Sequence, residues 1–103
     1  TTDNFWGSNS DFRSVWTKAL KDRTSVGCPT TKAVVILSLD EGRYEMTFFD
    51  AEGNPFDSVV VHGGEQKTLE MDLPMGALEL GEYRTSGSDA KGVQFEIRLI
   101  FPS

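Results

Sequence analysis

The chain has 103 residues, 38% of them hydrophobic, and a formal net charge of -6. This length fits a single domain, and the composition is that of a globular protein rather than a disordered one. No apolar run approaches the roughly 20 residues that cross a bilayer, so we expect no membrane span. Most acidic side chains follow residue 32, where they would repel a phosphate backbone. Nucleic acid is therefore not an expected partner.

Two parts of the single domain differ in pattern. Residues 1–31 are expected to form an arm, a helix and a loop packed on the domain, and residues 32–103 are expected to form a β-sandwich. Residues 1–9 are polar apart from Phe5 and Trp6. We interpret them as an N-terminal arm that these two aromatic rings hold in place.

Residues 10–23 have the spacing of an amphipathic helix. Apolar side chains recur at i, i+3, i+4, i+7 and i+8, which places them on one helical face. These side chains are Phe12, Val15, Trp16, Ala19 and Leu20. Such a stripe usually packs against a core, and this is the first interpretation. The second is that the helix, or the arm before it, docks into a partner through its tryptophan.

From residue 32 onward the chain has the pattern of β-strands separated by turns. Residues 33–37 are nearly all β-branched or aliphatic, so this strand is expected to be buried on both faces. The later expected strands alternate apolar and polar residues. They cover residues 44–49, 56–62, 67–73, 83–88 and 93–101. About 6–7 strands at this spacing predict an antiparallel Greek-key β-sandwich of the all-β class.

One passage of the chain occurs twice, 39 residues apart. The matching pairs are Gly42 and Gly81, Tyr44 and Tyr83, Asp50 and Asp89, Ala51 and Ala90, Gly53 and Gly92, and Phe56 and Phe95. In both copies an Asp begins a turn and a Gly accepts the positive φ that follows. We therefore expect residues 83–101 to repeat the hairpin of residues 44–62.

Each copy begins with a Leu-x-x-Gly-x-Tyr pattern. These structural corner residues are Leu39, Gly42 and Tyr44 in the first copy, and Leu78, Gly81 and Tyr83 in the second. The pattern resembles the tyrosine corner of Greek-key sandwiches, in which the Tyr hydroxyl bonds back to nearby backbone. A buried hydroxyl needs such a partner, because burial without one costs about 1–3 kcal/mol.

With these corners, residues 33–101 resemble immunoglobulin-like and fibronectin type III-like β-sandwiches. The second half is also similar to immunoglobulin-like modules of bacterial envelope and secretion-associated proteins, including flagellar hook-cap domains and the periplasmic copper-carrier fold. The resemblance implies a non-catalytic binding role and a secreted or periplasmic location. The copper ligands do not carry over, because His62 is the one histidine of the chain. We expect no metal and no other cofactor.

No residue pattern predicts catalysis, and we expect no enzymatic activity. His62 precedes two glycines at the end of a strand, and the chain has no G-x-S-x-G motif around a nucleophilic serine. Cys28 is the single cysteine, which excludes an internal disulfide, and no histidine lies near it in the sequence to activate its thiol.

The predicted function is that of a non-catalytic binding or adaptor module in an extracellular or periplasmic assembly, with a protein partner or a second copy of the chain. The candidate partner-binding residues are Phe5, Trp6, Phe12, Trp16, Lys18 and Lys21. Two alternatives stay open. One is a carbohydrate-binding module in which Trp6, Trp16 or Phe5 is the platform for a sugar, so that the partner is a glycan. The other is an acidic inhibitor or immunity protein that binds a basic protein.

Overall fold

The computed structural model places the chain in two antiparallel sheets and one helix. It describes residues 2–8, 11–27, 30–50, 52–73, 83–87 and 89–102. Leu78 and Gly81 of the second predicted corner, and Cys28, lie outside the described residues.

The elements follow one another along the described chain with the helix between the first two strands. They are β1 (Thr2–Ser8), α1 (Phe12–Ser25), β2 (Thr31–Ser38), β3 (Arg43–Phe49), β4 (Pro55–His62), β5 (Gln66–Leu73), β6 (Tyr83–Ser86) and β7 (Gln94–Ile100). The strands predicted from residue 33 onward are all present, and their ends differ from the prediction by no more than two residues. The continuous apolar run of residues 33–37 and the alternation of apolar and polar residues after it therefore located these strands well.

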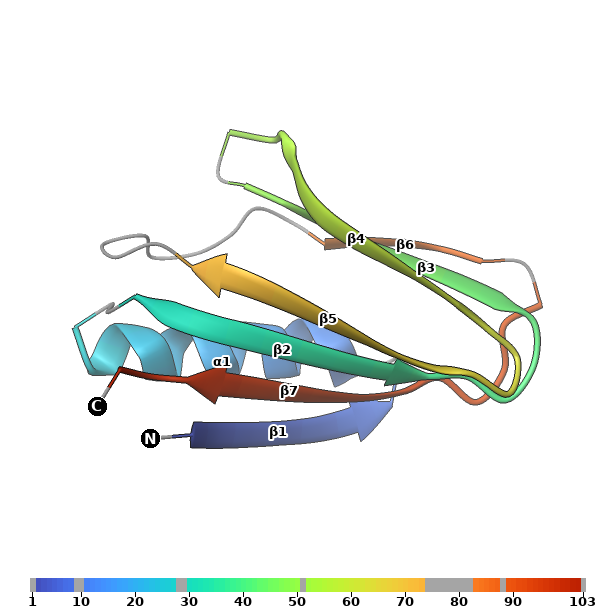
Figure 1. Ribbon diagram of the computed structural model, residues 1–103, viewed down its shortest axis with the longest axis horizontal. Coiled ribbons are helices and arrows are strands. Elements are labelled where there is room, and N and C mark those ends of the chain that lie inside the picture. Colours follow the sequence, from blue (N-terminus) through green and yellow to red (C-terminus); the bar gives the residue numbers. More distant parts are fainter. Residues whose placement is uncertain are drawn as a thin grey trace.

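The strands form a four-stranded sheet in the order β1-β7-β2-β5 and a three-stranded sheet in the order β4-β3-β6. The two sheets face each other, with β4 of one beside β5 of the other (Figure 1). In Figure 1, β1 begins and β7 ends at the same end of the molecule, and the β2–β3 and β4–β5 connections lie at the opposite end. This architecture confirms the predicted all-β sandwich with a short N-terminal helix.

The strand order differs from that of a constant-type immunoglobulin sandwich. In that fold the last strand joins the sheet of strands C and F. Here the last strand, β7, lies between β1 and β2 in the four-stranded sheet. This protein and the immunoglobulin fold both have two packed sheets, but the last strand pairs with different neighbours in the two folds. The immunoglobulin-like relationship therefore stays a prediction.

Strand β2 is central in the larger sheet and is buried on both faces along part of its length. Val35 and Leu37 point into the core and are fully buried, while Val34 on the opposite face is only 7% exposed. Val34 lies between Arg98 and Glu70 in the register of the neighbouring strands. This explains why its sequence is a nearly continuous apolar run rather than a clean alternation.

Helix α1 closes the sandwich with the stripe predicted from its sequence. Its buried residues are Phe12, Trp16, Ala19, Leu20 and Arg23. The helix lies against the inner side of the four-stranded sheet, behind β2 and β7 in the view of Figure 1. Its first buried residue, Phe12, makes edge-on ring contacts with Tyr83 of β6 and Phe95 of β7. The first interpretation of the stripe, packing on the domain itself, is confirmed. No helix in the described part of the chain is long and apolar enough to span a membrane.

The N-terminal segment is a strand, and its interpretation as an arm was wrong. Residues 2–8 pair with β7 in antiparallel register, with Trp6 opposite Glu96 and Gly7 opposite Phe95. Phe5 points inward and packs against the core, whereas Trp6 points outward and is 63% exposed. Within the described chain, β1 is an edge strand of its sheet, with β7 as its one neighbour. One face of β1 is exposed to solvent, which explains why most of its residues are polar.

The expectation that residues 83–101 repeat the earlier hairpin was also wrong. β3 and β4 pair with each other, but β6 pairs with β3 and β7 pairs with β2 and β1. The turn of the second copy therefore carries the chain from one sheet to the other. It also contacts residues 39–42 of the first copy, which connect β2 to β3 and which we call the arch. The amides of Asp40 and Glu41 in the arch both donate to the carbonyl of Lys91 at 3.1 Å.

The first corner has the buried residues that were predicted for it. Leu39 is 2% exposed and Tyr44 is 3% exposed, and Gly42 has a positive φ of 94°. The Tyr44 side chain hydrogen-bonds the side chain of Thr85 on β6. The bond from its hydroxyl to the backbone of the arch stays a prediction. Of the second corner, Tyr83 is half-buried against α1.

Burial raises the pKa of Tyr44 from 10.0 to about 12, although the Thr85 hydrogen bond acts in the opposite direction. The unfolded chain therefore loses this proton first, and the free energy of unfolding should fall as the pH rises from about 10 to about 12. Denaturation curves across that range, run with absorbance titration at 295 nm, measure both effects. Tyr44→Phe should show a smaller alkaline loss of stability, and an equal loss in the two proteins would contradict the assignment.

Arg23 lies in the interior rather than at the exposed end of the helix. Its side chain is 1% exposed, and its Nε donates a hydrogen bond of 3.1 Å to the buried Oγ1 of Thr31 at the start of β2. A guanidinium keeps its charge in any protein environment, so its burial requires such partners. Near the C-terminal end of the helix, the positive charge of Arg23 also suits the negative end of the helix dipole.

Candidate ligand-binding face

The outer face of the four-stranded sheet brings together side chains from four distant parts of the chain. Residues that are paired across antiparallel strands point to the same side of a sheet. The register therefore defines rows that run across the strands. One row consists of Trp6, Glu96, Ile36 and Thr68, and the next consists of Ser8, Gln94, Ser38 and Gln66.

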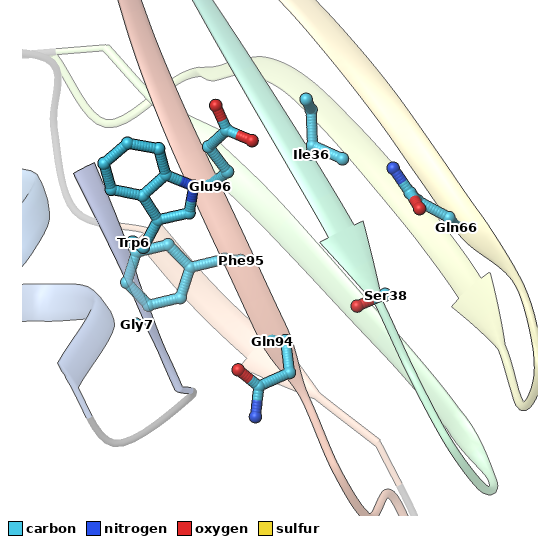
Figure 2. A pocket seen from close by; sticks show the side chains of 8 residues that line it. All are labelled: Trp6, Gly7, Ile36, Ser38, Gln66, Gln94, Phe95 and Glu96. Atoms are coloured by element: carbon cyan, nitrogen blue, oxygen red, sulfur yellow. The ribbon is translucent and has the colours of Figure 1, made fainter. Parts of the chain in front are cut away.

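Trp6 is the most exposed of the large hydrophobic side chains in the described chain, at 63%. Its indole ring stands at the β1 end of its row, and Figure 2 shows it on the outer side of the strand beside Glu96. Strand β1 pairs with β7 along its whole length in antiparallel register, so the backbone that carries the ring is held by a ladder of hydrogen bonds. An exposed aromatic ring on a rigid strand is an accessible, pre-positioned platform.

A hollow of about 210 Å³ lies next to this ring. Its lining comes from all four strands: Trp6 and Gly7 from β1, Gln94, Phe95 and Glu96 from β7, Ile36 and Ser38 from β2, and Gln66 from β5. Figure 2 shows the Trp6 ring at one end of this set and Gln66 at the other. We call the six outward-pointing residues the Trp6 face; they are Trp6, Ile36, Ser38, Gln66, Gln94 and Glu96.

Gly7 and Phe95 fix the sheet beneath the tryptophan. Phe95 points into the core and is 4% exposed, and its ring covers the backbone of Gly7. A Cβ at position 7 would come within 2.9 Å of the Phe95 Cζ. The absence of a side chain at Gly7 therefore lets β1 lie close to the ring, which holds the adjacent Trp6 in place.

The Trp6 face is close to electrically neutral although the whole chain carries -6. Glu96 is the one charged residue of the two rows, and its Oε2 accepts a hydrogen bond of 2.8 Å from the Nε of Arg98. Besides the indole N–H, the remaining polar groups of the six residues of the Trp6 face are two amides and one hydroxyl, which can donate and accept hydrogen bonds without carrying charge. The face therefore suits a neutral, polar ligand with one apolar surface.

Three other candidate residues meet at a second hollow. Phe5, Lys18 and Lys21 line a space of about 290 Å³ between β1 and α1, together with Asp22 and Ser25. A hydrogen bond with the Asp3 carboxyl, followed by burial and repulsion between the two carboxyl groups, raises the pKa of Asp22. Two amines and two carboxyl groups thus face the same region, with no excess of either charge.

The remaining two candidates belong to the core. Phe12 is fully buried and Trp16 is 5% exposed, and both rings pack against Phe48 of β3. Neither ring is on the accessible surface, so Trp16 does not serve as a sugar platform in this structure. Of the six predicted partner-binding residues, Trp6 alone lies on the outer face of the four-stranded sheet, where it is largely exposed.

Five residues of the Trp6 face were not predicted from the sequence to have a binding role, and Ile36 is one of them. Gln94 and Glu96 were expected to point outward from their strand, but Ser38 and Gln66 lay at or beyond the ends of the predicted strands. Their meeting depends on the pairing of β1 with β7 and of β2 with β5. The alternation pattern of a strand indicates a face, but it does not indicate which strand lies beside it.

Among the described residues, no group of three or more metal-ligating side chains lies together. Comparison of the chain with protein-family models, curated proteins and solved structures gave no significant match.

Proposed function

We propose that this protein is a non-catalytic binding module, and that its Trp6 face binds a neutral carbohydrate. The observation that carries the proposal is an exposed indole ring beside a hollow lined by amide, hydroxyl and carboxylate groups on one face of the four-stranded sheet. It follows the second of the functions considered from the sequence, with Trp6 as the platform. The secreted or periplasmic location is part of the same proposal.

The chemistry of a sugar ring matches this arrangement. A pyranose has a face of C–H groups and a rim of hydroxyls, so it can stack on an aromatic ring while its rim forms hydrogen bonds. The C–H face is attracted to the electron-rich face of an indole. Gln66, Gln94 and Ser38 provide donors and acceptors for hydroxyl groups, which themselves donate and accept. A few polar groups around an apolar contact are the usual composition of a ligand site.

The size of the hollow favours a small part of a ligand rather than an engulfed molecule. Its 210 Å³ lies below the roughly 300 Å³ at which pockets for drug-sized ligands begin. A sugar unit resting on an open face needs no deeper cavity. A charged ligand would gain little here, because the single carboxylate is already held by Arg98.

A protein partner fits this face less well. The large exposed hydrophobic side chains of the described chain are Trp6, Val26, Phe56 and Ile100. Trp6 and Ile100 are on the same face of the larger sheet but lie several residues apart, whereas Val26 and Phe56 lie on other elements. These side chains therefore do not form a continuous apolar patch. Sites for protein partners usually present such a patch, with an area of a few hundred Å². We therefore rank the adaptor function, with its protein or self-association partner, second.

Trp6→Ala should abolish or strongly weaken binding to neutral polysaccharides without unfolding the domain. Loss of about 1.4 kcal/mol of stacking would lower the affinity tenfold, whereas removal of a largely exposed side chain should change stability by about 0.5 kcal/mol or less. Affinity gel electrophoresis against a panel of soluble β-glucan, mannan and xylan, followed by calorimetry, measures the binding. Phe56→Ala removes an exposed ring from the other sheet and is the matched control.

Two results would contradict the proposal. One is an absence of retardation by every polysaccharide of the panel with the folded wild-type protein. The other is binding that Trp6→Ala leaves unchanged or that both variants weaken equally. Circular dichroism of each variant separates loss of binding from loss of fold.

A further inference from the structure

The hollow of the Trp6 face runs across the strands rather than along one of them. Each of the four strands provides an outward-pointing residue to it: Trp6 from β1, Glu96 from β7, Ile36 from β2 and Gln66 from β5 (Figure 2). Neighbouring strands are about 4.8 Å apart, so the distance across three intervals, from β1 to β5, is about 14 Å. One sugar ring covers only part of this distance.

The spacing of the strands matches the repeat of an extended sugar chain. A chain of β-1,4-linked hexoses advances about 5 Å for each ring, close to the strand spacing of about 4.8 Å. A chain laid across the sheet would therefore place about one ring above each strand. An α-1,4-linked chain coils instead, and its successive rings would leave the surface.

We propose that the Trp6 face binds a single extended chain of neutral β-linked sugars that crosses the four strands. This inference rests on the proposed function and specifies its ligand. The first ring stacks on Trp6, and the half-buried Ile36 offers an apolar contact in the middle of the path. Gln94 and Glu96 are within one strand of the tryptophan, whereas Gln66 lies three strands away and receives the far end of the chain.

The composition of the face favours a separate chain over the surface of a crystalline polysaccharide. Binding to a crystalline surface would be favoured by a flat array of several aromatic rings, and Trp6 is the one ring in the two rows that define this face. Adjacent strands of a sheet are also rotated by about 20–25° relative to each other. A single chain can follow that twist through its glycosidic bonds, but a crystal surface cannot.

Calorimetry with oligosaccharides of increasing length tests the inference. The probes are β-1,4-linked glucose, mannose and xylose oligomers of two to six units, with α-1,4-linked glucose oligomers as the comparison. We expect at least one β-linked series to gain tenfold or more in affinity between the dimer and the tetramer and little beyond it. The α-linked series should show no such gain.

Variants of one residue near Trp6 and of one far from it test where each part of the sugar chain binds. Gln94→Ala should weaken the dimer and the tetramer alike, while Gln66→Ala should weaken the tetramer several-fold and leave the dimer unchanged. Lys67→Ala is the matched control, because Lys67 is the next residue of the same strand but points to the opposite face of the sheet and does not line the hollow. Trp6→Ala should weaken every length.

The outcomes distinguish this inference from the function on which it rests. Trp6-dependent binding that is equal for the dimer and the tetramer, with no effect of Gln66→Ala, would overturn the extended chain and leave a site for one or two sugar units. An affinity that rises equally in the α-linked series would also overturn it. Absence of binding to all oligomers and polysaccharides would instead overturn the proposed function itself.

Discussion

Phe48→Ala is expected to lower the free energy of unfolding by about 4 kcal/mol, the largest single effect that the structure predicts. The side chain is fully buried, and deletion of a buried Phe to Ala typically costs 3–5 kcal/mol because a cavity remains. Its ring lies 5.2 Å from the ring of Trp16 and 6.1 Å from that of Phe12, measured between centroids. It therefore joins β3 of the smaller sheet to α1, and its loss weakens two interfaces at once.

Urea denaturation followed by Trp fluorescence measures this effect, and Phe56→Ala is its control. Phe56 lies on the neighbouring strand β4 but is 38% exposed, so its truncation should cost about 1 kcal/mol or less. Because a domain of this size is stable by about 5–15 kcal/mol, Phe48→Ala leaves a marginal fold. Equal losses in the two variants would contradict the packing of α1 against the smaller sheet.

Gly42→Ala is expected to cost about 3 kcal/mol or more, the second largest effect. Gly42 has a φ of 94°, which side-chain-bearing residues adopt at a cost of about 1–3 kcal/mol. In addition, a Cβ at this position would overlap the carbonyl oxygen of Asp89 and lie 2.7 Å from its carbonyl carbon. Both contacts are with backbone, which cannot rotate away, so the arch and the β6–β7 connection would have to separate.

Gly53→Ala separates the cost of the backbone conformation from the cost of the close approach. Gly53 has a similar φ of 86°, but nothing lies within 4 Å of a Cβ built on it. We expect it to cost about 1 kcal/mol, since the strain of a positive φ is partly offset by the reduced entropy of the unfolded chain. If thermal or chemical denaturation gave the same loss for both variants, the contact between the arch and Asp89 would be refuted.

Local patterns were sufficient to predict most elements of this fold. A continuous apolar run located β2, alternation located β3 to β7, and the helical stripe of Phe12, Trp16 and Leu20 located α1 and its buried face. Strand β1 was missed because its sequence has few β-branched residues and its solvated face is polar. Its place in the sheet comes from the ladder with β7, a contact between the two ends of the chain that no local pattern contains.

The internal repeat also shows that local sequence patterns do not determine which strands pair. The two copies share turn and corner residues, and those residues indicate local backbone conformation. They do not determine the partner of the following strand, which depends on contacts across the whole chain. For this reason β4 folds back on β3, while β7 leaves β6 and joins the other sheet.

Of the residues that form the candidate site, the sequence predicted only Trp6. Trp6 was selected because tryptophan is enriched at binding interfaces and can be a platform for a sugar, and the structure places it on the surface. Phe12 and Trp16 were selected for the same chemistry but belong to the core, as their helical spacing also allowed. Ser38, Gln66, Gln94 and Glu96 became visible as a group only when the strand register was known.

The central claim, that the Trp6 face binds a neutral glycan, is tested most directly by ¹H–¹⁵N correlation spectra recorded during titration with β-1,4-linked tetrasaccharides of glucose, mannose and xylose in turn. The domain has two indole N–H signals, and the buried Trp16 is an internal control for Trp6. We predict that at least one tetrasaccharide shifts the Trp6 indole signal and the side-chain amides of Gln94 and Gln66, and leaves Trp16 unchanged. An unchanged Trp6 signal with all three sugars, or shifts confined to the hollow between β1 and α1, would contradict the claim.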